Sequence, residues 1–345
     1  MAYNNQVDTL TLECIAPQVV DTVLRANEFT TKMLSKTKEF RAATIDFPIK
    51  YRKGTATQSF SGFDTLPSSF TDTRILMKFN PRFNAANIAL ALTDIAANNT
   101  PAKVLELTEV EMASRAQDLA DSIGDQLYSD GTGNANKDFI GLAYIVDDTS
   151  SIGGLSRTTY TTLASTVTAA SSNVLSLFKM RTLYNAIADA SVVPTETYAP
   201  YEVWALYEQL LQPQEKIQKE VTLAPNFKGY TGFNALMFAG LPVIADRKAT
   251  SGVMFMLNSN FINFHGLKAF SGSDSSGGFA GKPISVGSKL FTGNSYEAGE
   301  NLGFFWTGWI KATTQLAYNS FVVVGGNLVT DNPRRHGKLT GVTAI

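Results

Sequence analysis

The spacing of hydrophobic and polar residues changes along the chain, and the first clear pattern is one of alternation. Residues Phe47–Lys53 and Thr73–Phe79 alternate with the period of two that is typical of strands. The stretch between them is rich in Ser, Thr and Gly and contains Gly62 and Pro67, so we expect one long hairpin. A two-stranded ribbon is marginally stable alone in water. This hairpin therefore needs a surface to lie against, and that surface can belong to another chain.

The next pattern has the period of a helix. Thr100 can cap this helix, and Pro101 can occupy its first turn, where a missing N–H costs nothing. One apolar stripe then runs for about six turns, through Leu105, Met112, Ala116, Leu119, Ile123 and Leu127. We therefore expect a helix over Thr100–Ser129, preceded by an apolar strand at Ile88–Ile95.

Shorter elements fill the rest of the chain. Amphipathic patterns predict helices over Val174–Ala188 and Tyr201–Leu211. Strand patterns predominate after Phe233, at Leu241–Ala245, Val253–Leu257, Phe261–Phe264, Phe304–Tyr318 and Phe321–Val324. Helices that come early and strands that come late, without regular alternation, predict an α+β fold.

Composition narrows the class of protein. The 345 residues are 44% hydrophobic and 17% charged, which indicates a folded chain and excludes a disordered or fibrous one. The formal charge of −1 excludes the global positive field expected of a protein that coats nucleic acid. The single Cys14 cannot form an intramolecular disulfide. No secretion leader and no run of 18 apolar residues is visible, so we expect no membrane partner.

Charge is unevenly distributed, and three clusters stand out. The hairpin is locally basic, with cations at Lys50, Arg52, Lys53, Arg74 and Lys78. The long helix carries an acidic face at Glu106, Glu109, Glu111, Asp118, Asp121 and Asp125. The two can be complementary, within or between subunits, or each can be an ordinary solvated face. We expect the basic cluster of Arg334, Arg335, His336 and Lys338 to be a solvated terminus.

Motifs for catalysis or cofactor binding are missing from the sequence. No Gly-rich stretch has the spacing of a phosphate-binding loop or a dinucleotide fingerprint. Two histidines and one cysteine cannot form a usual zinc site, and His265 lies in an apolar context typical of a packed histidine. We therefore predict no catalytic residue, no cofactor and no metal, although thirty acidic residues leave an unrecognised carboxylate enzyme as an alternative.

Several short strings, in this order, resemble the major capsid proteins of tailed bacteriophages with the Hong Kong 97-type fold. The strings are Leu127–Gly131, Ile140–Leu142, Ile152–Arg157, Trp204–Glu208, Phe233–Leu236, Gly240–Asp246, Ser251–Val253 and Leu257–Asn258. With the hairpin and the long helix upstream of them, the resemblance spans roughly Phe47 to Pro333. The resemblance implies an N-terminal arm (1–44), an extended E-loop (45–82) and a P-domain (83–173) with a spine helix at 100–129. It further implies a stretch that is mainly A-domain (174–298) and a return to the P-domain sheet with a C-terminal tail (299–345).

The same resemblance implies a structural protein and not an enzyme. Copies of such a chain form hexamers and pentamers of an icosahedral head, assembled in the bacterial cytoplasm, which encloses double-stranded DNA without sequence-specific binding. Scaffold, portal and decoration proteins are the further partners that it implies, and the acidic helix face can then point into the lumen. An encapsulin-like nanocompartment shell is the alternative with the same fold.

Some proteins of this family join their subunits covalently through a lysine of the E-loop. In this chain no Lys or Arg occurs between Gly54 and Thr73. We therefore expect no such crosslink here.

Overall fold

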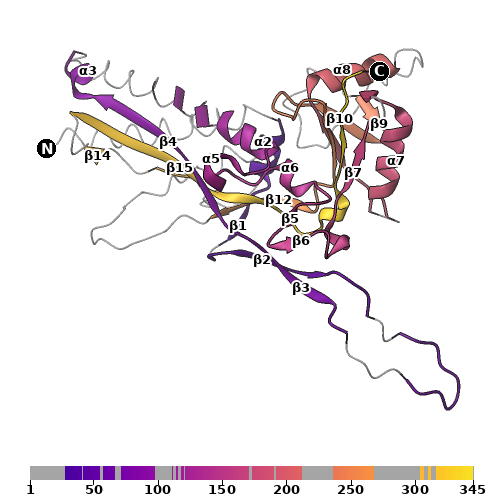
Figure 1. Cartoon of the computed structure of the whole chain (residues 1–345). Coiled ribbons are helices and arrows are strands. Elements are labelled where there is room, and N and C mark those ends of the chain that lie inside the picture. The colour runs from indigo at the N-terminus through magenta and orange to yellow at the C-terminus, as the bar shows by residue number, and fades with distance from the viewer. Residues whose placement is uncertain are drawn as a thin grey trace, which may run out of the picture.

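The computed structural model describes residues 28–40, 42–54, 57–66, 71–97, 111, 114–115, 118–119, 121–170, 173–189, 192–211, 236–267, 304–306, 310–311 and 316–344. These residues form two six-stranded sheets and two two-stranded ribbons, with helices beside them (Figure 1). The predicted α+β class is confirmed.

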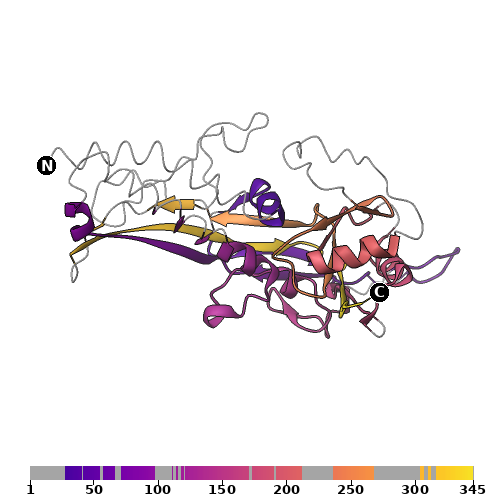
Figure 2. The same ribbon diagram turned by 90° about the horizontal axis from the view of Figure 1, so that it is seen from above.

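The first sheet is built around one long strand, β15 (Ala317–Thr330). Strand β4 (Arg82–Ala91) pairs antiparallel with it from Ala317↔Ala91 to Gly326↔Arg82. The other edge of β15 pairs in turn with β14 (Ile310–Lys311), β13 (Phe304–Trp306) and β12 (Ile262–Leu267). Strand β1 (Lys38–Phe40) then pairs parallel to β12. The result is an elongated sheet, visible edge-on in Figure 2.

Strand β15 differs from the expected pattern of two separate strands. It runs without a break through Gly325 and Gly326, residues that weaken the strand signal in the sequence. Pairing on both edges overrides this low propensity. The glycines also make room for neighbours, since a Cβ at Gly325 would lie 2.8 Å from the ring of Phe83.

The second sheet has the order β7, β16, β11, β8, β10, β9. These strands are β7 (Thr166–Ala169), β8 (Glu196–Ala199), β9 (Leu236–Phe238), β10 (Leu241–Ala245), β11 (Met254–Leu257) and β16 (Gly337–Thr340). Helices α7 (Leu177–Ile187) and α8 (Tyr201–Leu211) bury Met180, Leu183 and Tyr207 against the sheet. Both predicted helices are thus confirmed, although α7 begins three residues later than expected, where Ser176 accepts a hydrogen bond from the Phe178 N–H.

The sheets cross the boundaries that the sequence indicated. Strands β7 and β16 lie outside residues 174–298 yet belong to the second sheet, whereas β12 lies inside that range and belongs to the first. Parallel pairing of β16 with β7 joins segments about 170 residues apart, from Gly337↔Thr166 to Thr340↔Ala169. Such a long-range pair leaves no local signal in a sequence.

The prediction of a solvated C-terminal cluster was wrong for three of its four residues, since only Arg334 is exposed. His336 is fully buried, Lys338 lies in β16 with its ammonium 3.2 Å from Asp147, and Arg335 pairs with Asp189 at 2.9 Å. Pairing of β16 between β7 and β11 draws this segment into the second sheet. Burial lowers the pKa of His336 to about 3, so this side chain is neutral.

The predicted hairpin is confirmed as the ribbon of β2 (Ile45–Lys50) and β3 (Arg74–Phe79). It projects away from both sheets in the two views (Figures 1 and 2). Along the long helix, the described residues 111, 114–115, 118–119 and 121–128 are helical, and residues 98–110 lie outside the description. The apolar strand expected at Ile88–Ile95 ends at Ala91, and helix α3 (Leu92–Ala97) begins at the next residue.

The remaining elements are short. They are α2 (Glu28–Ser35), α3 (Leu92–Ala97), α5 (Gly133–Asn136), α6 (Leu142–Ile145), the ribbon of β5 (Ser151–Ile152) and β6 (Leu155–Ser156), and the 3-10 turns at Thr161–Leu163 and Pro333–Arg335. His265 of β12 is packed as expected, with its ring centroid 5.7 Å from that of Phe47, and burial lowers its pKa to about 4.

Candidate interaction surface

The base of the hairpin is fixed on its own chain. Ile45, Met77 and Phe79 point inward and are buried in the first core. The Lys78 N–H donates to the Gly153 carbonyl oxygen at 3.0 Å, which ties β3 to the turn between β5 and β6. Gly153 has a φ of 53°, and a Cβ there would lie 2.0 Å from Cγ of Met77. Glycine is therefore required at this contact.

Two side chains hold the junction where the hairpin returns to the first sheet. Arg82 Nη1 donates to the carbonyl oxygens of Gly131, at 2.6 Å, and of Asp138. Asn327 of β15 donates from Nδ2 to the Asn80 carbonyl at 2.8 Å, and its Oδ1 accepts from the Ile140 N–H at 2.8 Å. Burial lowers the pKa of Arg82, but the guanidinium remains charged at any physiological pH. The ribbon thus leaves the molecule in a defined direction.

The last described contacts between the hairpin and its own chain are at Tyr51. Its ring lies 5.1 Å from that of Tyr160, and its carbonyl oxygen accepts from Thr162 Oγ1 at 2.9 Å. Beyond this point the tip presents three apolar side chains, of which Phe60 is 64% exposed, Phe63 fully exposed and Leu66 55% exposed. We call these three residues the apolar tip. Exposed aromatic clusters of this kind mark interaction surfaces.

The apolar tip could not be predicted from the pattern of the sequence. Its only sequence signal is the pair of phenylalanines within a segment rich in Ser, Thr and Gly. A strand pattern cannot reveal it, because the tip lies in the connection between the strands.

The outer face of the ribbon is basic, as expected. The register places Lys50 directly opposite Arg74 and Asp46 opposite Lys78, and all of these side chains are exposed. Like charges directly opposite one another destabilise an antiparallel pair. None of the described ion pairs uses Lys50 or Arg74, so this face suits a negatively charged partner.

The other predicted cations have different surroundings. Arg52 is held in place, with its guanidinium 5.1 Å above the ring of Tyr51 and its Nε donating to the Asp72 carbonyl at 2.6 Å. Lys53 is exposed beyond the end of β2. The five cations therefore line one stretch of the ribbon without forming a single cluster.

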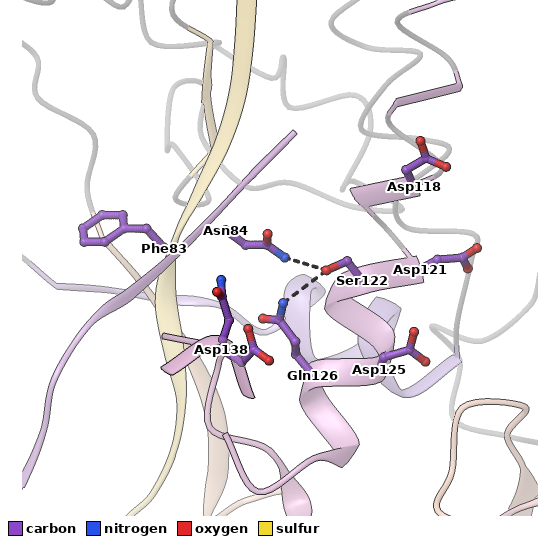
Figure 3. A pocket seen from close by; sticks show the side chains of 9 residues that line it. Phe83, Asn84, Asp118, Asp121, Ser122, Asp125, Gln126 and Asp138 are labelled. Carbon is purple, nitrogen blue, oxygen red and sulfur yellow. Dashed lines mark hydrogen bonds between the residues drawn. The ribbon is translucent and has the colours of Figure 1, made fainter. Parts of the chain in front are cut away.

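The described part of the acidic helix lines a cavity of about 560 Å³ beside β4 (Figure 3). Asp118, Asp121 and Asp125 line it from the helix, on the side of the helix that points away from Asn84 in Figure 3, and each carboxylate side chain is more than half exposed. Asn84 Nδ2 of β4 donates across the cavity to Ser122 Oγ of the helix at 3.1 Å, and Gln126 Nε2, one turn further along the same helix, donates to the same oxygen at 3.1 Å. The cavity is also lined by Asn134 of α5, by Asp138 and by the exposed ring of Phe83. We call this hollow the acidic groove.

Two cations neutralise part of the acidic helix. Lys248 lies 2.9 Å from Asp125 and 3.7 Å from Asp121, and Arg115 lies 3.0 Å from Asp118. Glu111 is half-buried, and the predicted residues Glu106 and Glu109 lie outside the described residues. The contribution of Lys248 could not be foreseen, because it comes from a loop more than 120 positions further along the chain.

Complementarity between the hairpin and the helix within one chain is not found in the described part. None of its ion pairs joins Lys50, Arg74 or Lys78 to an acidic side chain of the helix. Lys50 and Arg74 of the basic face thus have no described ion-pair partner, whereas the three aspartates of the acidic groove already lie beside Arg115 and Lys248.

Metal sites and membrane-spanning helices are not found in the described residue ranges. No group of three or more His, Cys, Asp or Glu side chains there is placed to hold a metal ion. None of the helices in those ranges has both the length and the hydrophobicity that a membrane span needs. A second cavity, also about 560 Å³, lies at the hairpin base between Lys78, Arg82, Tyr144 and Gly154.

The chain matches no protein family model and no curated protein. Among solved structures it is similar to a chain of the "Cyanophage A-1(L) capsid asymmetric unit", with a TM-score of 0.69 and 14% identity over 90% of this chain and 92% of that one. It is also similar to the SrpI encapsulin of Synechococcus elongatus PCC 7942 (TM-score 0.53, 11% identity, 91% and 87% covered). A third similar structure is the capsid of an empty GTA particle (0.51, 9%, 88% and 87%). At these identities the likeness concerns the fold, and this chain has the Hong Kong 97-type capsid fold that its sequence resembles.

Proposed function

We propose that this chain is the major capsid protein of a tailed phage, and that its copies form the hexamers and pentamers of an icosahedral shell around double-stranded DNA. The observation that carries the proposal is the similarity to the cyanophage capsid chain, which extends over nine-tenths of both chains. In this assignment the first sheet belongs to the P-domain, the second to the A-domain, and the ribbon of β2 and β3 to the E-loop.

The hairpin supports an assembling protein because its described contacts with the rest of the chain end at Tyr51, near its base. Burying each phenylalanine of the apolar tip against a neighbouring copy would contribute about 1.5–3 kcal/mol. A chain held by several such neighbours at once gains stability that no single contact supplies. Each hairpin thus bridges two copies, fixed at its base by Arg82 and Asn327 and completed at its tip by the neighbour.

The charges give the contact a direction. We place the basic face of the hairpin, at Lys50 and Arg74, near the acidic groove of an adjacent copy. Complementary charges guide the approach and fix the register of a contact. In the competing arrangement the acidic groove faces the lumen and repels the packaged phosphates, and shell formation would then be indifferent to the charge of the hairpin.

Electron microscopy of the purified protein tests the assembly. We expect closed, thin-walled particles, whereas a small discrete oligomer would contradict the proposal and favour an enzyme with an unrecognised carboxylate site.

A nanocompartment shell is the second candidate, favoured by the similarity to the SrpI encapsulin. The contents of native particles distinguish the two. Nuclease-protected double-stranded DNA supports the phage capsid, and a protein cargo without DNA supports the compartment.

A further inference from the structure

Helix α2 is held where the long helix and the second sheet meet. Its residues Phe29, Thr30, Met33 and Leu34 are fully buried. The ring of Phe29 lies 5.3 Å from that of Tyr128, in the long helix, and 5.0 Å from that of Tyr198, in β8 of the second sheet. Helix α2 therefore connects the long helix to the second sheet through one aromatic contact.

Two buried carboxylates lie beneath this contact. Asp246, directly after β10, accepts hydrogen bonds from the Phe29 N–H at 3.3 Å, the Tyr128 hydroxyl at 2.9 Å and the Lys248 N–H at 2.9 Å. Glu196 of β8 accepts from the Tyr198 hydroxyl at 2.8 Å and forms an ion pair with Lys32 of α2. Asp246 is 3% exposed and Glu196 is 2% exposed.

Glu28, in the first turn of α2, adds a third carboxylate to this place. It directly precedes Phe29, whose N–H donates to Asp246, and it lies one turn before Lys32, which pairs with Glu196. The charges of Asp246, Glu196 and Lys32 all act on its carboxyl group. The ammonium of Lys248 is directed elsewhere, to Asp121 and Asp125. Among the described ion pairs, only that of Lys32 with Glu196 neutralises a member of the cluster. Three carboxylates with one paired ammonium favour uptake of a proton.

The charge states agree with this geometry. Burial, and then the charge of Asp246, raises the pKa of Glu28 to about 7. Burial likewise raises the pKa of Asp246, and it lowers the pKa of Lys36, one turn further along α2. Glu28 therefore titrates near neutral pH.

We propose that α2 is a proton-controlled clasp, which closes over the cluster of Glu28, Glu196 and Asp246 when Glu28 is protonated and loosens when that proton leaves. The direction follows from linkage. A carboxyl group that binds its proton more tightly in the docked helix than in the undocked one stabilises docking at low pH. Docking therefore weakens as the pH rises from about 4.5 to about 7, between the ordinary pKa of Glu28 and its raised value. A rise in pH would therefore loosen the connection that α2 makes between the second sheet and the long helix.

Hydrogen exchange of the α2 amides in the full-length protein tests the clasp, with labelling times scaled to equalise intrinsic exchange between pH 5.5 and pH 8. We expect the protection of the wild-type α2 amides to fall about tenfold from pH 5.5 to pH 8. A tenfold change is the equivalent of one pKa unit, a size that allows for the partial exposure of Glu28 to solvent. The variant Glu28→Gln imitates the protonated carboxyl, and its α2 should stay protected at both pH values.

The matched control is Glu208→Gln, on α8, which should keep the wild-type pH dependence. Protection of α2 that does not change with pH in the wild type would overturn the proposal. So would a loss of protection in Glu28→Gln at pH 5.5, because it would mean that the charged form of Glu28 holds the helix. The amides of α8 serve as the internal reference for global opening.

Discussion

At the scale of single residues, the structure depends on a few residues whose close contacts or buried hydrogen bonds few other residue types could make. Gly153 lies against Met77, Asn327 fills a gap between two loops, and Arg157 is fully buried with Nη2 donating to the carbonyls of Tyr144 and Ile145 at 2.9 and 2.6 Å. Each connects the hairpin base or the second sheet to the rest of the chain. A substitution at such a position should cost more than composition or exposure alone would indicate.

The two glycines of the β5–β6 turn provide a matched pair. Both have positive φ, but a Cβ at Gly154 meets nothing within 4 Å, whereas one at Gly153 overlaps Met77. We expect Gly154→Ala to lower the free energy of unfolding by about 1 kcal/mol through backbone strain. Gly153→Ala should cost about 1–3 kcal/mol more, because Met77 must move. Urea denaturation of the purified variants measures both, and equal costs would show that the contact with Met77 is unimportant.

Asp147 makes a pH-dependent contribution. Burial opposes its ionisation, but hydrogen bonds from Ser150 and the charge of Lys338 outweigh burial and hold its pKa below the usual value. Its ionised form also lies 3.7 Å from the buried guanidinium of Arg157. Removing this charge leaves Arg157 without its ion pair, so Asp147→Asn should cost roughly 2–4 kcal/mol at pH 7.

Because the folded-state pKa of Asp147 is lowered, its stabilisation is complete above the ordinary pKa of about 4 and is lost as the pH falls below it. The difference in unfolding free energy between wild type and Asp147→Asn should therefore shrink in acid. The exposed neighbour Asp148 provides the control, and Asp148→Asn should have little effect at any pH. A deficit of Asp147→Asn that persists unchanged at pH 3 would refute the explanation.

At the scale of elements, local patterns and long-range pairings differ in how well they can be predicted. The two strands of the hairpin, α7 and α8 can be predicted from the sequence because the periodic pattern of each lies within a dozen residues. The continuity of β15 and the place of β16 in the second sheet depend on partners far away in the chain, and their glycines and charges point to loops. The carboxylate cluster under α2 likewise unites residues 28, 196 and 246, which no spacing rule connects.

The apolar tip is the part of the hairpin that should matter most for assembly. We expect Phe60→Ser combined with Phe63→Ser to leave the chain folded, because neither side chain is buried in it, but to reduce particle formation strongly. The control Ser59→Ala changes an exposed neighbour without removing apolar area. Particle yield by sedimentation is the measurement, and a wild-type yield from the double variant would argue against the role of the tip.

The basic face of the ribbon makes a different prediction. Lys50→Ala with Arg74→Ala removes two like charges that face each other, so the ribbon itself should be no less stable. Assembly should nevertheless become slower at low salt, since the attraction to the acidic groove is lost, and the difference from wild type should fade at high salt. Light scattering follows the rate. An unchanged rate at low salt would favour the luminal position of the acidic groove.

At the scale of the whole molecule, the two sheets form an elongated body from which the hairpin projects (Figures 1 and 2). A fixed base and an unsupported tip suit a chain whose structure is completed by its neighbours. The resemblance in the sequence led to the fold, but the residues that would carry assembly became visible only through exposure and register. The names of the predicted segments remain proposals, because each sheet contains strands from more than one of these segments.

The absence of lysine from the connection between the strands bears on how the copies are joined. Lys50 and Lys53 lie near the hairpin base, and no Lys occurs between Gly54 and Thr73. We therefore expect mature particles to run as a single monomer-sized band on a denaturing gel. A ladder of multimers would demonstrate covalent joining through other residues.

The most direct test of the central claim is a cryo-electron microscopy reconstruction of the assembled particle at a resolution that shows side chains. The account predicts that Phe60 and Phe63 of each copy are buried against an adjacent copy, while Arg82 and Asn327 keep the hairpin base as it is here. A tip that stays in solvent, or that folds back onto its own chain, would contradict it.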